Sequence, residues 1–322
     1  MISRRNIRVK VMQTLYTMTT IESESTLPPA PSNPIRPGQP DRESLKILLD
    51  HFSQTRSLLI YLLYFLAEVT RYAETDAHQR AGKHLPTAAD RNVNIKIAGN
   101  ELLCKMLEDP ALKEQFTEEK PDRLIDKELL RKIYNNLTGT PEYKAYVSQP
   151  ARDQSEEKKI LEFILNDLLL ASEVFVSHVE ENFSNWDDDG EMVVQLLAGY
   201  LQKPGSYEFR QIITADKEQF SKSLLQTVME KGEHLQSLII PKLKNWDPER
   251  IALLDMIMMK MGVAEFLYFE TIPPKVTINE YIDIAKEYST PQSGQFVNGI
   301  LDNIHKELVL QGKMQKVDYK KQ

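Results

Sequence analysis

The chain has 322 residues, 41% of them hydrophobic, which is enough for two or three domains with packed cores. Its formal net charge is −7, so it has no overall attraction for nucleic acid, and any RNA site must be a local basic patch. The 12 glycines fall below the usual share of about 7%, which favours helices over turn-rich sheet folds.

Cysteine usage and hydropathy predict a cytoplasmic protein that makes no contact with a membrane. Cys104 is the only cysteine, which excludes an internal disulfide and fits a reducing compartment. The first ten residues lead into an amphipathic segment, so we expect no signal peptide. The longest apolar run, Leu58 to Ala67, is about half the ~20 residues that a membrane span needs, and it favours a buried helix.

The first twenty residues predict an amphipathic helix with a basic rim. Apolar residues recur at helical spacing and form one stripe: Ile7, Val11, Leu15 and Met18. The same segment has no acidic residue and four basic ones: Arg4, Arg5, Arg8 and Lys10. We expect the helix to bury its stripe and to hold the arginines at the edge of the buried face.

The long middle of the chain predicts a linker followed by helices. Residues 27–40 contain six of the 17 prolines, and proline interrupts helices, so residues 21–42 are expected to be an exposed linker. Helical patterns follow at 43–75, 95–107 and 124–137.

A sequence echo occupies the end of this middle part. Residues 156–197 align with 216–257 at a constant offset of 60 without a gap, and their apolar positions coincide. The two tryptophans of the chain, Trp186 and Trp246, fall on each other. We interpret the echo as a duplicated helical hairpin, or as two hairpins that solve the same packing problem.

Three helices are predicted after Trp246. Asp247 is suited to cap the first of them, and the proline pair at 273–274 ends it. Thr277 and Glu280 have the spacing of a capping box and predict the start of the second. The third carries an apolar stripe at helical spacing: Phe296, Ile300, Ile304 and Leu308.

Motifs that carry catalysis or bind cofactors are absent from the sequence. There is no GxxxxGK[ST], no GxGxxG after a strand and no GxSxG, and the six histidines are scattered. The acidic run 187–190 lacks the glutamate of a calcium loop, because the twelfth position is Ala198. We therefore expect no enzyme, no cofactor and no metal site.

The two ends of the chain resemble the NusB family of bacterial transcription antitermination factors. Residues 4–16 follow the family pattern RRxARxxALQxLY, and the C-terminal part contains further motifs in the family's order, namely Lys275-Val276, Ile278-Asn279-Glu280, Ala285-Lys286 and Phe296-Val297-Asn298-Gly299. Residues near 21–206 have no counterpart in the shorter members. The chain looks like a long-insertion, Bacteroidetes-like member of the family.

The resemblance implies an all-α fold of helical bundles. Residues 1–20 and 207–314 would form the NusB-like domain, 21–42 the proline-rich linker, 43–206 a helical insertion and 315–322 a basic tail. The implied function is RNA-binding transcription antitermination and elongation. Such a factor binds the boxA-type RNA of ribosomal RNA leaders together with the ribosomal protein NusE and RNA polymerase.

The resemblance also assigns candidate sites. With Lys10 from the basic run, the expected RNA-binding residues are Arg4, Arg5, Arg8, Lys10, Gln13, Tyr16, Gln295, Phe296 and Asn298. Glu249 falls where the family offers a carboxylate to its protein partner. We expect the first and last helices to pack together, so that Arg5 and Phe296 share one RNA surface.

Some details of these sites stay open. Phe296 either stacks on a base or belongs to the core, and Gln295 replaces a usual lysine of the family. Gly299 weakens a helix by about 1 kcal/mol against alanine, so we expect another backbone or helix to approach closely there. Three other interpretations compete with the RNA-binding factor: a protein-binding helical adaptor, the accessory domain of an RNA cytosine methyltransferase, and an unrelated helical enzyme.

Overall fold

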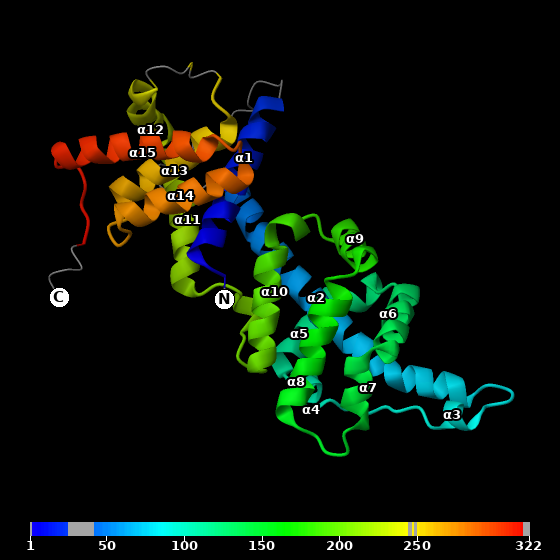
Figure 1. Cartoon of the computed structure of the whole chain (residues 1–322). Coiled ribbons are helices and arrows are strands. Elements are labelled where there is room, and N and C mark those ends of the chain that lie inside the picture. The colour runs from blue at the N-terminus through cyan, green and yellow to red at the C-terminus, as the bar shows by residue number, and fades with distance from the viewer. Residues whose placement is uncertain (1, 25–41, 244–246, 248–249, 318–322) are drawn as a thin grey trace. The chain divides into compact units, whose positions relative to one another are not determined.

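The computed structural model describes residues 2–24, 42–243, 247 and 250–317, and every regular element in these ranges is a helix (Figure 1). This confirms the predicted all-α class. The chain divides into two compact units. We call Phe52–Ile212 the central unit, and Ile2–His51 with Ile213–Gln322 the terminal unit. None of the described helices is long and apolar enough to cross a membrane.

The terminal unit brings the first helix together with the last ones. Its elements are α1 (Arg4–Glu24), the first turns of α2 (Arg42–Ala81), α11 (Ala215–Glu230), α12 (Gly232–Ile239), the 3₁₀ helix η4 (Ile240–Lys242), α13 (Leu253–Tyr268), α14 (Pro274–Tyr288) and α15 (Ser293–Leu310). Helix α13 is buried along most of its length and packs against α1, α11, α12, α14 and α15. It is therefore the core helix of this unit.

The packing of α1 follows its apolar stripe. Ile7, Val11, Leu15 and Met18 are all buried, as predicted. Close packing elsewhere depends on a glycine, because a Cβ at Gly262 of α13 would lie 2.8 Å from the Leu301 side chain. Glycine at that position lets α15 approach the core helix.

Two predicted helix starts in the terminal unit are wrong. Helix α14 begins at Pro274, where proline suits the first helical position, so Thr277 lies inside the helix and not at its cap. Helix α13 begins at Leu253 with Ala252 as its N-cap, so Asp247 does not cap it.

The central unit contains the remaining helices. They are the rest of α2, α3 (Ala88–Arg91), α4 (Glu101–Glu108), α5 (Pro110–Glu119), η1 (Pro121–Leu124), α6 (Lys127–Gly139), α7 (Pro141–Ser148), α8 (Gln154–Phe163), the π-helical η2 (Ile164–Leu169), α9 (Glu173–Asn182), α10 (Trp186–Gln202) and η3 (Phe209–Gln211). The apolar run of α2 is buried except for the half-buried Tyr64, which confirms a core helix there.

The sequence echo corresponds to similar packing in the two units. Phe175 and Val179 of α9 are buried, and so are the aligned Leu235 and Ile239 of α12. The two copies differ in where their second helix begins. Helix α10 begins at Trp186, whereas α13 begins at Leu253, and Trp246 lies outside the described residues.

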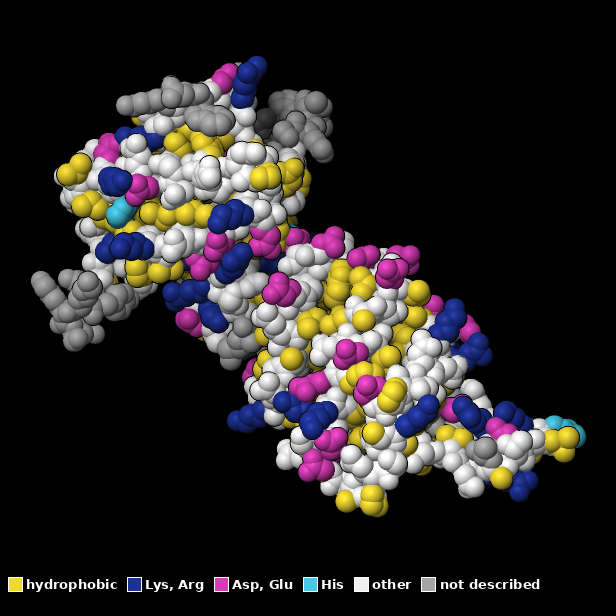
Figure 2. All heavy atoms as spheres, in the orientation of Figure 1, with side chains coloured by type: hydrophobic (Ala, Val, Ile, Leu, Met, Phe, Trp, Pro, Cys, Tyr) yellow, Lys and Arg dark blue, Asp and Glu magenta, His cyan; other side chains and the backbone are white. Residues whose placement is uncertain are grey.

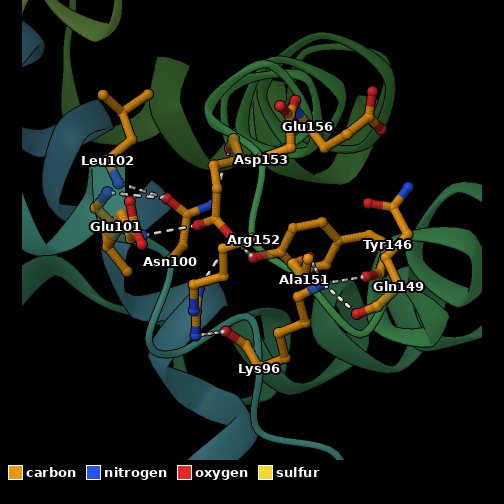
Figure 3. Close-up of polar contacts among 12 residues, drawn as sticks. Lys96, Asn100, Glu101, Leu102, Tyr146, Gln149, Ala151, Arg152, Asp153 and Glu156 are labelled. Carbon is orange, nitrogen blue, oxygen red and sulfur yellow. Dashed lines mark hydrogen bonds and ion pairs between the residues drawn. The ribbon is translucent and has the colours of Figure 1, made fainter.

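Polar side chains of the central unit form hydrogen bonds between its segments. Lys96 Nζ donates hydrogen bonds to the carbonyl oxygens of Tyr146 and Gln149, each at 2.8 Å (Figure 3). The Asn100 side chain caps α4 and also donates to the Glu157 carbonyl oxygen at 2.8 Å. These bonds attach the segment before α4 to α7 and α8, so they stabilise the fold of this unit.

Candidate nucleic-acid interface

The three arginines of α1 differ in exposure and, in part, in their neighbours. Arg4 is exposed, and its guanidinium lies 5.6 Å from the ring centroid of Phe220 on α11. Arg5 is 40% exposed and pairs with Glu287 at 2.8 Å and with Asp283 at 3.7 Å, both on α14. Arg8 faces the core, and its guanidinium lies 5.5 Å from the same Phe220 centroid. Arg4 and Arg8 thus share Phe220, whereas Arg5 pairs with α14.

Arg8 forms a buried ion pair with the core helix. Its Nε lies 2.7 Å from Glu265 Oε1 and its Nη2 lies 3.0 Å from Oε2, while Nη1 is 3.4 Å from Glu280. Glu265 also accepts hydrogen bonds from Thr277 and Tyr281, each at 2.8 Å. Burial raises the pKa of Tyr281 well above its usual value, and Glu265 adds to this, so the phenol stays a donor.

This arrangement differs from the expected role of Arg8 and Lys10. Their exposed fractions are 1% and 2%, so neither side chain reaches solvent. Arg8 neutralises a carboxylate that is itself fully buried, and a buried charge is tolerated only when it is paired. Of the other α1 candidates, Gln13 is half-buried and Tyr16 is 42% exposed.

The candidates on α15 lie along its outer side. Gln295 and Asn298 are exposed and Phe296 is half-buried, whereas Val297, two residues after Gln295, belongs to the core. Phe296 therefore combines core contact with an accessible edge. None of the described residues makes the expected close approach at Gly299, because a Cβ there would meet nothing within 4 Å among them.

The two ends of the chain meet through α14. Arg5 pairs with Asp283, and Lys286 Nζ lies 3.8 Å from the same carboxylate. On its other side Lys286 packs against α15, since a Cβ at Gly294 would lie 2.8 Å from Lys286 Cγ. The start of α1 and the start of α15 therefore both lie next to the last turns of α14. We define the end surface as the half-buried Arg5 together with the exposed residues of these three segments: Arg4, Asp283, Lys286, Glu287, Gln295, Asn298 and Gly299.

The end surface has mixed charge. Arg5 and Lys286 are accompanied by Asp283 and Glu287. Figure 2 likewise shows basic and acidic side chains interspersed over the terminal unit on the face in view. The end surface is therefore not purely basic: its basic groups lie beside acidic ones.

Glu249, the expected partner-binding carboxylate, lies outside the described residues. Lys316 of the basic tail caps the core helix, with Nζ 2.8 Å from the Glu265 carbonyl oxygen and 2.7 Å from that of Phe269. Within the described ranges, no cluster of three or more His, Cys, Asp or Glu side chains could hold a metal ion.

The sequence interpretation missed the centre of this arrangement. Glu265, Thr277 and Tyr281 fix the arginine that joins α1 to α13 and α14. One signal was available: Glu265 is an acid inside an otherwise apolar helix, and such a residue needs a buried partner.

The fold and the end surface thus define an all-α protein whose first helix is held against its C-terminal helices by a buried arginine. Residues 183–306 match the model of the NusB family. The chain is 36% identical over 126 residues to the Transcription antitermination protein NusB of Methylacidiphilum infernorum (isolate V4). The matched region covers 36% of this chain and 87% of that protein. The chain belongs to the NusB family.

Two other relatives bear the same name. The chain is 41% identical over 97 residues to the protein of Salinibacter ruber, covering 30% of this chain and 61% of the relative. It is 40% identical over 93 residues to that of Chloroherpeton thalassium, covering 29% and 44%. The chain thus spans less than two thirds of these two relatives. No solved structure matches it.

Proposed function

We propose that this chain is an RNA-binding transcription antitermination and elongation factor. It binds boxA-type RNA of ribosomal RNA leaders together with the ribosomal protein NusE and RNA polymerase, and it acts in the cytoplasm without catalysing a reaction. Membership of the NusB family and the name shared by three relatives support this proposal. In the proposed division, residues 1–20 and 207–314 are the RNA-binding domain and 43–206 is an insertion.

One observation supports the proposal: the start of α1 and the start of α15 both lie next to the last turns of α14. Arg5 at the start of α1 and Lys286 near the end of α14 supply charges that suit phosphates. Exposed amides at Gln295 and Asn298 suit hydrogen bonding to unpaired bases, and the half-buried Phe296 is a candidate for stacking.

The proposed contact set is narrower than the sequence suggested. Arg8 and Lys10 are buried, so we assign Arg8 a positioning role and leave Lys10 out of the contacts. The remaining candidates are Arg4, Arg5, Gln13, Tyr16, Gln295, Phe296 and Asn298. Glu249 keeps its proposed role toward NusE.

The acidic neighbours of Arg5 do not prevent phosphate binding. Arg5, Asp283 and Glu287 have side chains that are 40–52% exposed. Exposed ion pairs of this kind contribute about 0–1 kcal/mol, so a phosphate can replace a carboxylate at little cost. Meanwhile the pairs hold the Arg5 guanidinium beside α14.

A titration of labelled boxA RNA, with and without NusE, tests the proposal. The variants are Arg5→Ala and a matched control, Arg131→Ala, which removes an exposed ion-paired arginine from the central unit. We expect Arg5→Ala to weaken binding and to reduce the salt slope by about one, as for one lost phosphate contact. The control should bind like wild type. Equal binding by all three proteins would contradict the proposed surface.

A helical protein–protein adaptor is the second candidate function. It is favoured by the mixed charge of the end surface and by the burial of two of the four basic residues of α1. An adaptor would bind NusE and would show no affinity for boxA RNA in the same titration.

A further inference from the structure

An open cleft of about 720 Å³ lies on the central unit, between the middle of α2, the short η1 and the first turns of α6. Its volume is in the range of ligand-binding clefts. All the residues that line it belong to the proposed insertion, and they precede the region 183–306 that matches the NusB family model. The ligand of this cleft is therefore a separate matter from the RNA site proposed on the terminal unit.

The α2 wall of the cleft is a stripe of two tyrosines with a glutamate between them. Tyr64, Glu68 and Tyr72 are spaced four residues apart, so they lie on one side of the helix, and all three are half-buried. Tyr64 packs edge-on against Phe116 of α5, and Tyr72 packs against Tyr134 of α6, with 5.1 Å between the ring centroids in each pair. The two rings are thus held in place before a ligand enters.

The carboxylate between the two rings is only partly neutralised. Glu68 pairs with Arg71 at 3.1 Å, but the Arg71 side chain is 51% exposed. Burial raises the pKa of Glu68 in spite of this pair. Burial also raises the pKa of Tyr64, and the charges of Glu68 and of Asp122 on η1 add to this effect while Arg71 opposes it. Both carboxylates therefore act on the same ring, and a cation placed beside it is stabilised.

The other charges of the cleft favour a cation over an anion. Arg131 pairs with Glu128 at 2.7 Å, so two of the three basic residues in the cleft are already paired with acids. The charged residues that remain in its lining are two acids and one base: Glu74, Asp122 and Lys127. The start of α6 offers little to a phosphate, because the Asp126 side chain already accepts hydrogen bonds from the N–H groups of Glu128 and Leu129.

The net charge of the central unit also favours a basic partner. Between Phe52 and Ile212 the chain has 27 acidic and 19 basic residues, so this unit accounts for the negative charge of the whole chain. Such an excess attracts cationic partners and repels nucleic acid. An RNA strand is therefore disfavoured as the occupant of the cleft.

We propose that the cleft binds an arginine-containing segment of a partner protein, with one arginine side chain lying between Tyr64 and Tyr72 beside the Glu68 carboxylate. The guanidinium makes cation–π contacts with the rings and an ion pair with Glu68. Its methylene groups pack on the apolar side chains of the other wall, Ile125 and Leu130. Arginine suits this site better than lysine, because its planar group stacks on aromatic rings. The cleft is larger than one arginine side chain, so neighbouring residues of the segment also fit.

Anisotropy titrations of the full chain with a labelled nonapeptide of alternating arginine and serine test the inference. The control peptide carries citrulline, the neutral isostere of arginine, at the same positions and should bind about tenfold more weakly. Glu68→Gln and Tyr72→Leu should each weaken binding of the arginine peptide by roughly five- to tenfold. The matched control Glu191→Gln, which removes an exposed carboxylate from α10, should bind like wild type. Urea midpoints establish that each variant is folded.

The other outcomes would overturn the inference, each in a different way. Equal weakening by Glu68→Gln and Glu191→Gln would show general charge attraction without a site. Binding of arginine amide as tight as that of the peptide would show a site for small cations, and tighter binding of ATP than of the peptide would show an anion site. Absence of peptide binding would exclude the proposed occupant. None of these measurements uses RNA, so their failure leaves the proposed function of the terminal unit untouched.

Discussion

Glu157 in the central unit and Glu265 in the terminal unit are both buried, yet their partners come from different distances along the chain. Glu157 accepts hydrogen bonds from Tyr146, from Arg152 and from the Glu101 backbone N–H, the last of these 56 residues away. Its network is closed within the central unit.

Glu265 has a partner at the far end of the chain. Arg8 is 257 residues away, and the other donors, Thr277 and Tyr281, lie on the following helix. The Arg8 side chain is only 2% exposed, whereas the Arg152 side chain is 34% exposed. The buried ion pair therefore joins the first helix to the C-terminal helices, in addition to the apolar packing of α1.

The largest expected effect is that of Arg8→Ala. It leaves Glu265 buried without its cation, which typically destabilises by about 3–5 kcal/mol. Urea unfolding gives the loss, and hydrogen exchange of α1 should show early opening of that helix. The double variant Arg8→Met with Glu265→Gln should recover part of the loss. Stability equal to that of Arg5→Ala would contradict the role given to Arg8.

Arg152→Ala sharpens the comparison with a smaller effect. Glu157 keeps two donors and Arg152 is partly solvated, so we expect a loss of roughly 1–2 kcal/mol. The same urea measurement applies, with α1 exchange unaffected. A loss as large as that for Arg8→Ala would remove the distinction between the two networks.

The pH dependence of Tyr281 gives a third test. Its folded pKa lies well above 10, because the phenol is buried beside Glu265. The unfolded chain therefore loses this proton first as the pH rises through about 10, so the stabilisation is present below that pH and is lost above it. Comparing urea midpoints at about pH 8 and pH 10.5, Tyr281→Phe should lose less stability than wild type on going to alkaline pH. An identical loss would contradict the assignment.

The smallest expected effect concerns the exposed pair of Arg5. Glu287→Gln removes the carboxylate that competes with phosphate, so affinity for boxA RNA should increase about two- to fivefold, which corresponds to the modest strength of exposed ion pairs. Glu128→Gln, which frees the exposed Arg131 in the central unit, is the control. A decrease in affinity with Glu287→Gln would place the RNA elsewhere.

Periodic patterns in the sequence predicted much of the fold. The stripe of α1 and the apolar run of α2 are both buried, because spacing alone determines which side of a helix is apolar. Helix boundaries were less predictable. Helix α2 continues to Ala81, past the predicted end at residue 75, and Pro274 starts α14 one turn before the apparent capping box.

The candidate site was predictable only in part. Three arginines on one helix are equivalent in sequence, and only the position of Glu265 on another helix determines which of them is buried. Likewise, nothing local distinguishes Gly299, which is open, from Gly294, which contacts Lys286. Tertiary contacts decide both cases, and sequence spacing carries no information about them.

Photo-crosslinking of boxA RNA to the full chain in the presence of NusE tests the central claim most directly. If the two ends form one RNA surface, crosslinked peptides should come from both the start of α1 and the first half of α15. Crosslinks confined to the central unit, or to only one of these two helices, would contradict the account.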